Sequence, residues 1–162
     1  MHPAPISSTE PDWSREEIQY WWQPSRQLLR SIRSYQRARA SRGVIARVRR
    51  LVAVLKHRFW SAVTAADIPL NCQLGGGLVL THPNGVVIHP DAVVGPNCLI
   101  LQQVTLVSGV RLGGHVDIGA GAKVVRPVTI GDHAKVGANA VVLTDIPAGA
   151  TAVGIPATVL AG

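Results

Sequence analysis

One histidine of the sequence, His82, has surroundings suited to acid–base chemistry. Its candidate partner is Asp67, which lies fifteen residues earlier in the chain. An aspartate beside a histidine holds the imidazole in one tautomer and stabilises the imidazolium, which is the arrangement of a general base. The alternative is that His82 only stabilises the loop in which it lies. Either role requires structural elements that bring the two residues together.

A six-residue period indicates what those elements are. An aliphatic residue returns at every sixth position from Ile88 onward, namely Ile88, Val94, Ile100, Leu106, Leu112, Ile118, Val124, Ile130, Val136 and Val142. A second series follows four positions behind each of them, namely Ala92, Cys98, Val104, Val110, Val116, Ala122, Val128, Ala134, Ala140 and Ile146. Upstream, Ile68, Leu74 and Leu80 keep the same period.

The period is broken once, between Leu80 and Ile88, where the interval is eight residues. Two additional residues therefore lie within the segment 81–85, which contains His82. Counting through the insertion puts Ile88 one coil above Ile68, so the loop with His82 is expected at the corner nearest Asp67. Irregularities in β structure often place a side chain for function.

A period of six fits neither an α-helix nor a strand that alternates at every second residue. It is typical of a parallel β-helix, in which each hexapeptide forms one short side of a coil and the coils stack on their neighbours. We therefore predict a mainly β protein, a β-helix of hexapeptide repeats with a short N-terminal helical segment. An antiparallel sandwich is the alternative, but the turn signals are not spaced for hairpins.

The N-terminal third of the chain has a different composition. Residues 1–66 carry a net charge of +8 and residues 67–162 a net charge of −1, and all seven aromatic residues precede residue 61. We predict a disordered N-terminus (1–12), a basic helical segment (13–62), a hexapeptide-repeat β-helix domain (63–148) and a C-terminal tail (149–162). Ser14 and Glu17 predict a capping box at the start of a helix. A second helix, over about 44–60, has an apolar stripe that is expected to pack on the end of the β-helix or on another subunit.

The basic charge favours contact with an anionic partner, although no motif of nucleic-acid recognition accompanies it. We expect no nucleic-acid binding and leave two alternatives open, a solvated or anion-facing helical surface and contact with a membrane surface. No signal peptide and no apolar run long enough to span a bilayer are visible, which predicts a cytoplasmic protein. Cys72 and Cys98 occupy inward positions and are expected to be small buried hydrophobes. No three residues have the spacing of metal ligands, so no metal is expected.

Several motifs in residues 60–162 resemble those of the serine acetyltransferases, a family of hexapeptide-repeat acyltransferases. The matching segments are Asp67–Pro69, Gly77–His82, Gly85–Ile88, Leu101–Leu106, Ile118–Lys123, Val136–Val142 and Val153–Ala157. The resemblance implies a left-handed β-helix, homotrimers with active sites between subunits, acetyl-CoA as the acetyl donor and a place in cysteine biosynthesis. Pairs of trimers joined through the N-terminal helices are a further expectation.

The resemblance also implies roles for individual residues. The catalytic histidine of the family corresponds to His82 and its aspartate partner to Asp67. His82 would take the proton of the acceptor hydroxyl, the oxygen would attack the thioester, and His82 would return the proton to the leaving thiolate. The residues expected to contact CoA are Ala120, Lys123, Ala138, Thr144, Gly154 and Pro156.

Departures from the family pattern concern the acceptor. Thr81 stands where the family has an aspartate before the catalytic histidine, and the family's loop with an Arg-His-Pro motif is missing. Arg111 and His115 are the candidates to replace its contacts. L-serine is the acceptor expected from the family. Because of these departures, a sugar or a cell-surface polysaccharide hydroxyl is the alternative. A non-catalytic assembly module is the alternative from another class.

Overall fold

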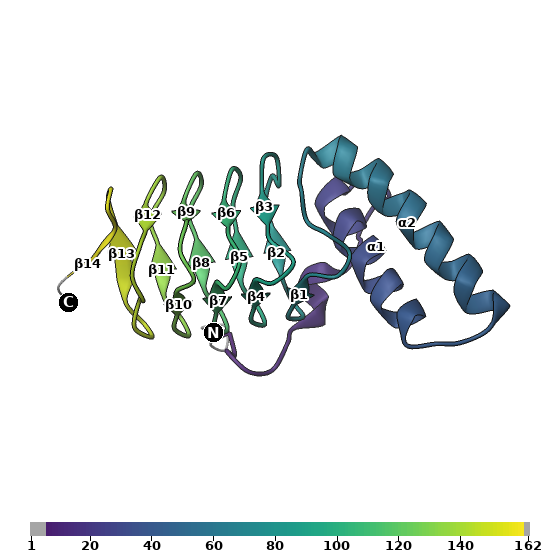
Figure 1. The fold of residues 1–162 in the computed structure, drawn as a ribbon, viewed down its shortest axis with the longest axis horizontal. Coiled ribbons are helices and arrows are strands. Elements are labelled where there is room, and N and C mark those ends of the chain that lie inside the picture. The colour runs from purple at the N-terminus through teal and green to yellow at the C-terminus, as the bar shows by residue number, and fades with distance from the viewer. Residues whose placement is uncertain (1–5, 161–162) are drawn as a thin grey trace.

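The computed structural model describes residues 6–160. A short 3-10 helix, η1 (Trp13–Glu16), precedes two α-helices, α1 (Pro24–Arg39) and α2 (Val44–Thr64), and the strands follow them. The strands are β1 (Gln73–Leu74), β2 (Val79–Leu80), β3 (Val87–Ile88), β4 (Val93–Val94), β5 (Leu99–Ile100), β6 (Thr105–Leu106), β7 (Arg111–Leu112), β8 (Asp117–Ile118), β9 (Lys123–Val124), β10 (Thr129–Ile130), β11 (Lys135–Val136), β12 (Val141–Val142), β13 (Thr151–Val153) and β14 (Thr158–Val159). The coils stack into a rod with the helical hairpin at one end and β13 and β14 at the other (Figure 1).

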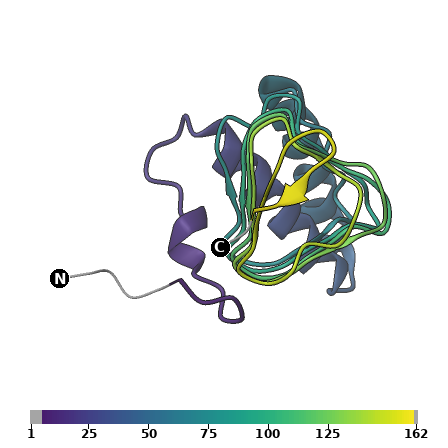
Figure 2. The same cartoon turned by 90° about the vertical axis from the view of Figure 1, so that its left-hand side faces the viewer.

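The strands form three parallel faces, which gives each coil three sides. The faces are β1-β4-β7-β10, β2-β5-β8-β11-β13 with β14 added at the end, and β3-β6-β9-β12. Viewed along the rod, successive coils superimpose on one another (Figure 2). This arrangement confirms the predicted β-helix of hexapeptide repeats.

The pairing register locates the insertion. Above the loop, partners are eighteen residues apart, as Val93 is from Arg111. Across the loop, partners are twenty residues apart, as Gln73 is from Val93 and Val79 from Leu99. The two additional residues are thus accommodated in one loop between β2 and β3, as predicted, and they do not disturb the stacking of the coils.

The interior of the coils is filled by the two aliphatic series. Ile88, Ile100 and Ile118 are at most 1% exposed, and the small residues four positions later are fully buried. Glycine is required where coils approach closely. A Cβ atom at Gly95 would overlap the backbone carbonyl of Gly113 in the next coil, so a larger residue there would push the coils apart.

Helix α1 closes the first coil. Leu28, Leu29 and Ile32 of α1 belong to the same buried cluster as the coil interior. Arg33 donates hydrogen bonds of 2.6 Å to the carbonyl oxygens of Leu74 and Gly75 at the end of β1. The open end of the stack, whose unpaired backbone groups would otherwise face water, is covered in this way.

The prediction of a capping box at Ser14 and Glu17 is wrong, because the capping residue is Asp12. The side chain of Asp12 accepts a hydrogen bond from the amide of Ser14, and the resulting 3-10 helix ends after four residues. The first α-helix begins at Pro24. Proline suits this first position because its φ is that of a helix and because the N–H of a first-turn residue has no partner within the helix.

Residues 6–12 are ordered, which corrects the expected disorder of residues 1–12; residues 1–5 of that expectation lie outside the described residues. Asn97, which is fully buried, donates from its amide nitrogen to the carbonyl oxygens of Ser7 (2.8 Å) and Glu10 (2.7 Å). Its Oδ1 accepts from the amide of Asp12 at 2.8 Å. One polar side chain thus holds the N-terminal segment along a corner of the coils.

Helix α2 packs on α1 through the face that the sequence interpretation did not single out. Ala46, Ala53 and Trp60 are buried, whereas the predicted apolar stripe is exposed in the single chain. The expectation that this stripe packs on the end of the β-helix is therefore wrong. The small side chains of Ala46 and Ala53 allow the two helices to approach closely, which decides the packing face.

The C-terminal tail turns back on itself. Strand β13 continues the parallel face of β11, and β14 pairs with β13 in the antiparallel sense. The hairpin closes the second end of the stack. None of the helices in residues 6–160 combines the length and the apolar character needed to span a membrane.

The two cysteines give a first testable prediction. Both are free and buried, and burial raises the pKa of the Cys72 thiol to about 12 and that of Cys98 to about 11. Because the thiolate is the reacting form, alkylation by iodoacetamide at about pH 8 should be slower by about 100-fold or more in the native protein than in the urea-unfolded chain. Mass spectrometry of the alkylated protein measures this; equal rates in the two states would contradict the burial of both thiols.

Candidate active site

The loop that contains His82 is held by the coil on each side of it. The amide of Gly85 donates to the carbonyl oxygen of Ala65 at 2.8 Å, and the amide of Thr81 donates to Ile100 in the next coil at 3.2 Å. Pro83 is buried within the loop. His82 itself adopts a positive φ of 51°, a backbone conformation that few residues other than glycine take, and its side chain is exposed. The loop therefore presents the imidazole outward from a fixed backbone.

Asp67 lies directly beside the end of this loop. Its amide donates to the carbonyl oxygen of Val86 at 2.8 Å, and its carbonyl oxygen accepts from the amide of Ile88 at 3.0 Å. The predicted juxtaposition of the two segments, with Ile88 one coil above Ile68, is confirmed by this register. Within residues 6–160, however, no hydrogen bond or ion pair within 4.0 Å joins the side chains of Asp67 and His82. Both side chains are exposed and can change rotamer rapidly, so the contact between them stays a prediction.

A pocket of about 300 Å³ lies against His82. One wall is the coil segment 78–82, which includes Thr81, and the other wall comes from the N-terminal segment and the start of α1. The residues of that second wall are Arg15, Tyr20, Trp22, Gln23, Pro24, Ser25, Arg26 and Leu29. The pocket is thus built between two parts of the chain that are far apart in sequence.

The second wall was missed by the sequence interpretation, which named no pocket residue before residue 67. The available signal was the run Tyr20-Trp21-Trp22 two residues before a helix-starting proline, because three aromatic residues in succession cannot all lie on one helical face. The side chain of Arg15 donates to the backbone carbonyl oxygen of Asn97. The side chain of Arg26 donates to the backbone carbonyl oxygen of Glu17. These bonds hold the wall in place while both guanidinium groups border the pocket.

The residues expected to contact CoA are partly brought together on one corner. We call the corner between the β2-β5-β8-β11 face and the β3-β6-β9-β12 face the insertion corner; it comprises residues 81–86, 101–104, 119–122 and 137–140. Backbone hydrogen bonds join successive coils along this corner. The amide of Gln103 donates to the carbonyl oxygen of Asn84 (2.9 Å), that of Gly121 to the carbonyl oxygen of Gln102 (2.8 Å) and that of Asn139 to the carbonyl oxygen of Ala120 (2.8 Å). The amide of Val141 then donates to Gly154 in the tail at 3.1 Å.

Ala120, Ala138 and Gly154 therefore lie in one column above the loop of His82. Lys123 follows the corner on β9 and its ammonium group donates to the carbonyl oxygen of Gln103, and Pro156 lies in the turn of the tail hairpin. Thr144 lies beyond β12, one side of the coil away from the column. In residues 6–160, no cluster of three His, Cys, Asp or Glu side chains is arranged to hold a metal ion.

The two candidate acceptor residues, Arg111 and His115, lie elsewhere in the same chain. Arg111 is on β7, in the face opposite the insertion corner, and His115 is at the corner between the β1 and β2 faces. The Nδ1 atoms of His115 and His133 are 2.9 Å apart, so one ring donates and the other accepts. Within one chain, neither residue reaches the pocket of His82.

The histidine pair predicts a pH dependence of stability. Burial lowers the pKa of His115, and the nearby charges of His133, Arg15 and Lys135 lower it further, against the opposing effect of Asp117. The unfolded chain therefore binds a proton that the folded chain resists, and stability is lost as the pH falls below the ordinary histidine value of about 6.5. His115→Asn should show a smaller fall in Tm between about pH 7.5 and about pH 5.5 than the wild type. His89→Asn is the control, and an unchanged pH dependence in His115→Asn would contradict the assignment.

No family model matches the chain. It is 45% identical over 122 residues to chloroplastic serine acetyltransferase 1 of Arabidopsis thaliana, an alignment that covers 70% of this chain and 39% of that protein. Among solved structures, a serine acetyltransferase in complex with CoA superposes with a TM-score of 0.72 at 30% identity, over 86% of this chain and 57% of the other.

The chain is a homologue of the serine acetyltransferases. The Neisseria gonorrhoeae serine acetyltransferase in complex with serine is similar as well, with a TM-score of 0.71 and 32% identity over 86% of this chain and 58% of that one. The chain spans about two fifths of the length of the curated relatives that it matches. The family resemblance predicted from the motifs is confirmed by these similarities.

Proposed function

We propose that this protein is a CoA-dependent O-acetyltransferase that transfers the acetyl group of acetyl-CoA to the hydroxyl of a small acceptor, with His82 as the general base. The observation that carries the proposal is the single insertion in the coil, which presents His82 between an open pocket and a column of small residues in a homologue of the serine acetyltransferases. A purely structural repeat would not require an imidazole at its only irregularity.

The chemistry follows from the position of the imidazole. His82 takes the proton of the acceptor hydroxyl, and the oxygen forms a bond to the carbonyl carbon of the thioester. The bond from that carbon to sulfur then breaks, and the imidazolium returns its proton to the thiolate, so that the products are the acetyl ester and CoA. Asp67 stabilises the imidazolium once the two side chains meet. The histidine ends the cycle in the state in which it began.

The insertion corner fits the donor. Ala120 and Ala138 are small, and their side chains leave room beside the backbone for the extended arm of CoA. Four coil steps of about 4.8 Å separate the loop of His82 from the tail, about 19 Å in all. We infer that Gly154 and Pro156 of the tail border the far end of the donor and that Lys123 is the nearest cation for its phosphates.

L-serine is the acceptor that the homology favours, since the similar structures include complexes with serine and a complex with CoA. One observation favours the alternative, a sugar or polysaccharide hydroxyl. No carboxylate lines the pocket of His82, whereas Arg15, Arg26, Tyr20 and Trp22 do. The ammonium group of serine would lack a charged partner there, while a sugar ring can pack on aromatic side chains.

We further propose a homotrimer, in which a second subunit supplies the outer side of the insertion corner. The support is that Arg111 and His115 are remote from the His82 pocket of their own chain and that this corner is open on its outer side. Light scattering during gel filtration should give three times the chain mass of 17.2 kDa. A monomeric mass in an active preparation would overturn the trimer but not the acetyl transfer.

The deciding experiment is thiol release from acetyl-CoA with a panel of acceptors. L-serine, homoserine, simple hexoses and an oligosaccharide are tested in parallel, and the two buried cysteines of the protein contribute little to the thiol signal. Release with serine alone assigns a serine acetyltransferase, and release with the sugars alone assigns the second candidate. Binding of CoA without release for any acceptor would overturn the enzyme proposal and favour the assembly module.

A further inference from the structure

Helix α2 presents an apolar face that nothing in residues 6–160 covers. The side chains of Val44, Val48, Leu51, Val52, Leu55 and Phe59 follow the spacing of a single helical face and are between 44% and 74% exposed. The buried residues Ala46, Ala53 and Trp60 lie on the opposite face, against α1. The exposed stripe is therefore a second, outward surface of the hairpin, which forms one end of the rod (Figure 1).

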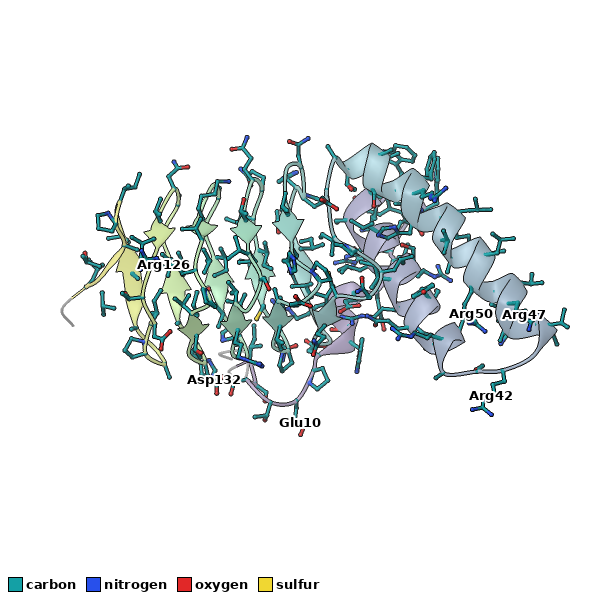
Figure 3. The ribbon with its side chains drawn as sticks, in the orientation of Figure 1. Glu10, Arg42, Arg47, Arg50, Arg126 and Asp132 are labelled. Carbon is teal, nitrogen blue, oxygen red and sulfur yellow. The ribbon has the colours of Figure 1, made fainter. Side chains whose placement is uncertain are left out.

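Cations border this stripe on both edges. Helical spacing places Arg47 and Arg58 along one edge and Arg49 and Lys56 along the other. Figure 3 shows Arg42, Arg47 and Arg50 at the part of the hairpin farthest from the coils. From residue 18 to residue 66 the chain contains no aspartate or glutamate, whereas the same stretch holds eleven arginines and lysines.

The two features meet in a groove between α1 and α2. The groove has a volume of about 420 Å³ and is bordered by the cations Arg37, Arg49 and Lys56. Val48 and Val52 of the apolar stripe form part of its lining. An anionic group held there would lie directly beside aliphatic side chains that face outward.

We propose that α2 docks the protein on an anionic phospholipid bilayer, with the apolar stripe in the headgroup region and the flanking cations on lipid phosphates. An apolar stripe between two rows of basic residues is the pattern of helices that lie in the plane of a membrane surface, and each cation near an anionic surface adds to the attraction. The charge decides against the main competing occupant. A second copy of this hairpin would bring two surfaces of the same sign together without an acidic residue to offset the repulsion.

The proposal is tested with the full chain and vesicles of stated composition. Co-sedimentation is measured with vesicles of phosphatidylcholine alone and of phosphatidylcholine with phosphatidylserine in a two-to-one ratio. Binding is expected to the second kind only and to weaken as salt is raised, because exposed charges are screened. Failure to bind the phosphatidylserine vesicles would overturn the proposal.

Matched variants separate the stripe from general surface effects. Leu51→Gln with Leu55→Gln should lower binding by at least about tenfold and leave Tm unchanged, since both side chains are exposed. Val125→Gln with Val159→Gln changes two exposed apolar side chains of the coil region and should have little effect. Arg47→Gln with Arg58→Gln should lower binding several-fold more than Arg111→Gln with Arg126→Gln, although the change in net charge is the same.

Two outcomes would contradict the assignment. If the coil pairs weaken binding as much as the helix pairs, the attraction is that of the whole basic chain and not of the stripe. If Leu51→Gln with Leu55→Gln divides a larger assembly in gel filtration and the wild type ignores vesicles, a second copy covers the stripe. Acetyl transfer is measured separately, so the proposed function and the docking proposal can fail independently.

Discussion

His82→Ala is expected to lower kcat for acetyl transfer by about 100-fold to 10,000-fold, with little change in the KM for acetyl-CoA. The imidazole is the one group at the pocket that can take the hydroxyl proton and return it to the thiolate. The donor is expected to be bound by the small residues of the insertion corner, which the substitution does not touch. Steady-state rates of thiol release measure both constants.

The matched control is His89→Ala. His89 is also an exposed histidine that closely follows a coil strand, and its Nδ1 lies 3.5 Å from Oδ2 of Asp91 at a different corner. Its loss should leave kcat within a factor of about two of the wild type. If His82→Ala keeps wild-type activity while its Tm is unchanged, His82 is not the general base and its loop has a structural role only.

Arg33→Met should lower the free energy of unfolding by about 3 kcal/mol. Arg33 and Glu16 form an ion pair of 2.8 Å in which each side chain is only 9% exposed, and Glu16 also accepts the amide of Leu78 at 3.1 Å. Removing the guanidinium leaves a carboxylate with little water and no cation, and it also leaves the carbonyl oxygens of Leu74 and Gly75 without their donor. Urea unfolding followed by circular dichroism measures the loss.

Arg30→Met, on the exposed side of the same helix, is the control and should change the free energy of unfolding by less than about 0.5 kcal/mol. The double variant Arg33→Met with Glu16→Gln should recover part of the loss, because the amide carries no charge to leave unpaired. If Arg33→Met and Arg30→Met have equal free energies of unfolding, the ion pair does not hold the N-terminal segment on the first coil.

His82 and Arg33 act on different parts of the same site. His82 belongs to the coils, whereas the ion pair of Arg33 and Glu16 secures η1, which is followed in the chain by the wall with Tyr20 and Trp22. The pocket exists because the N-terminal segment is held against the coils. A variant that loosens the pair should therefore weaken acceptor binding more than donor binding.

The six-residue period determined much of this protein from the sequence alone. It specified the inward series, the parallel stacking, the position of the only insertion and the placement of that loop beside Asp67, because all of these follow from local spacing repeated along the chain. The column of Ala120 and Ala138 above His82 follows from the same count.

Only the tertiary structure decided the features that depend on contacts between distant residues. Asn97 binds the N-terminal segment across 85 to 90 positions of sequence, and no local pattern marks that partnership. The face of α2 that packs on α1 was misjudged, because the close approach of Ala46 and Ala53 outweighs the larger apolar residues on the other side. The second wall of the pocket has the same origin. Periodicity specifies structure where each coil repeats its neighbour, and the helical segment has no such repeat, so its packing is settled only by the shape and charge of the surfaces that meet.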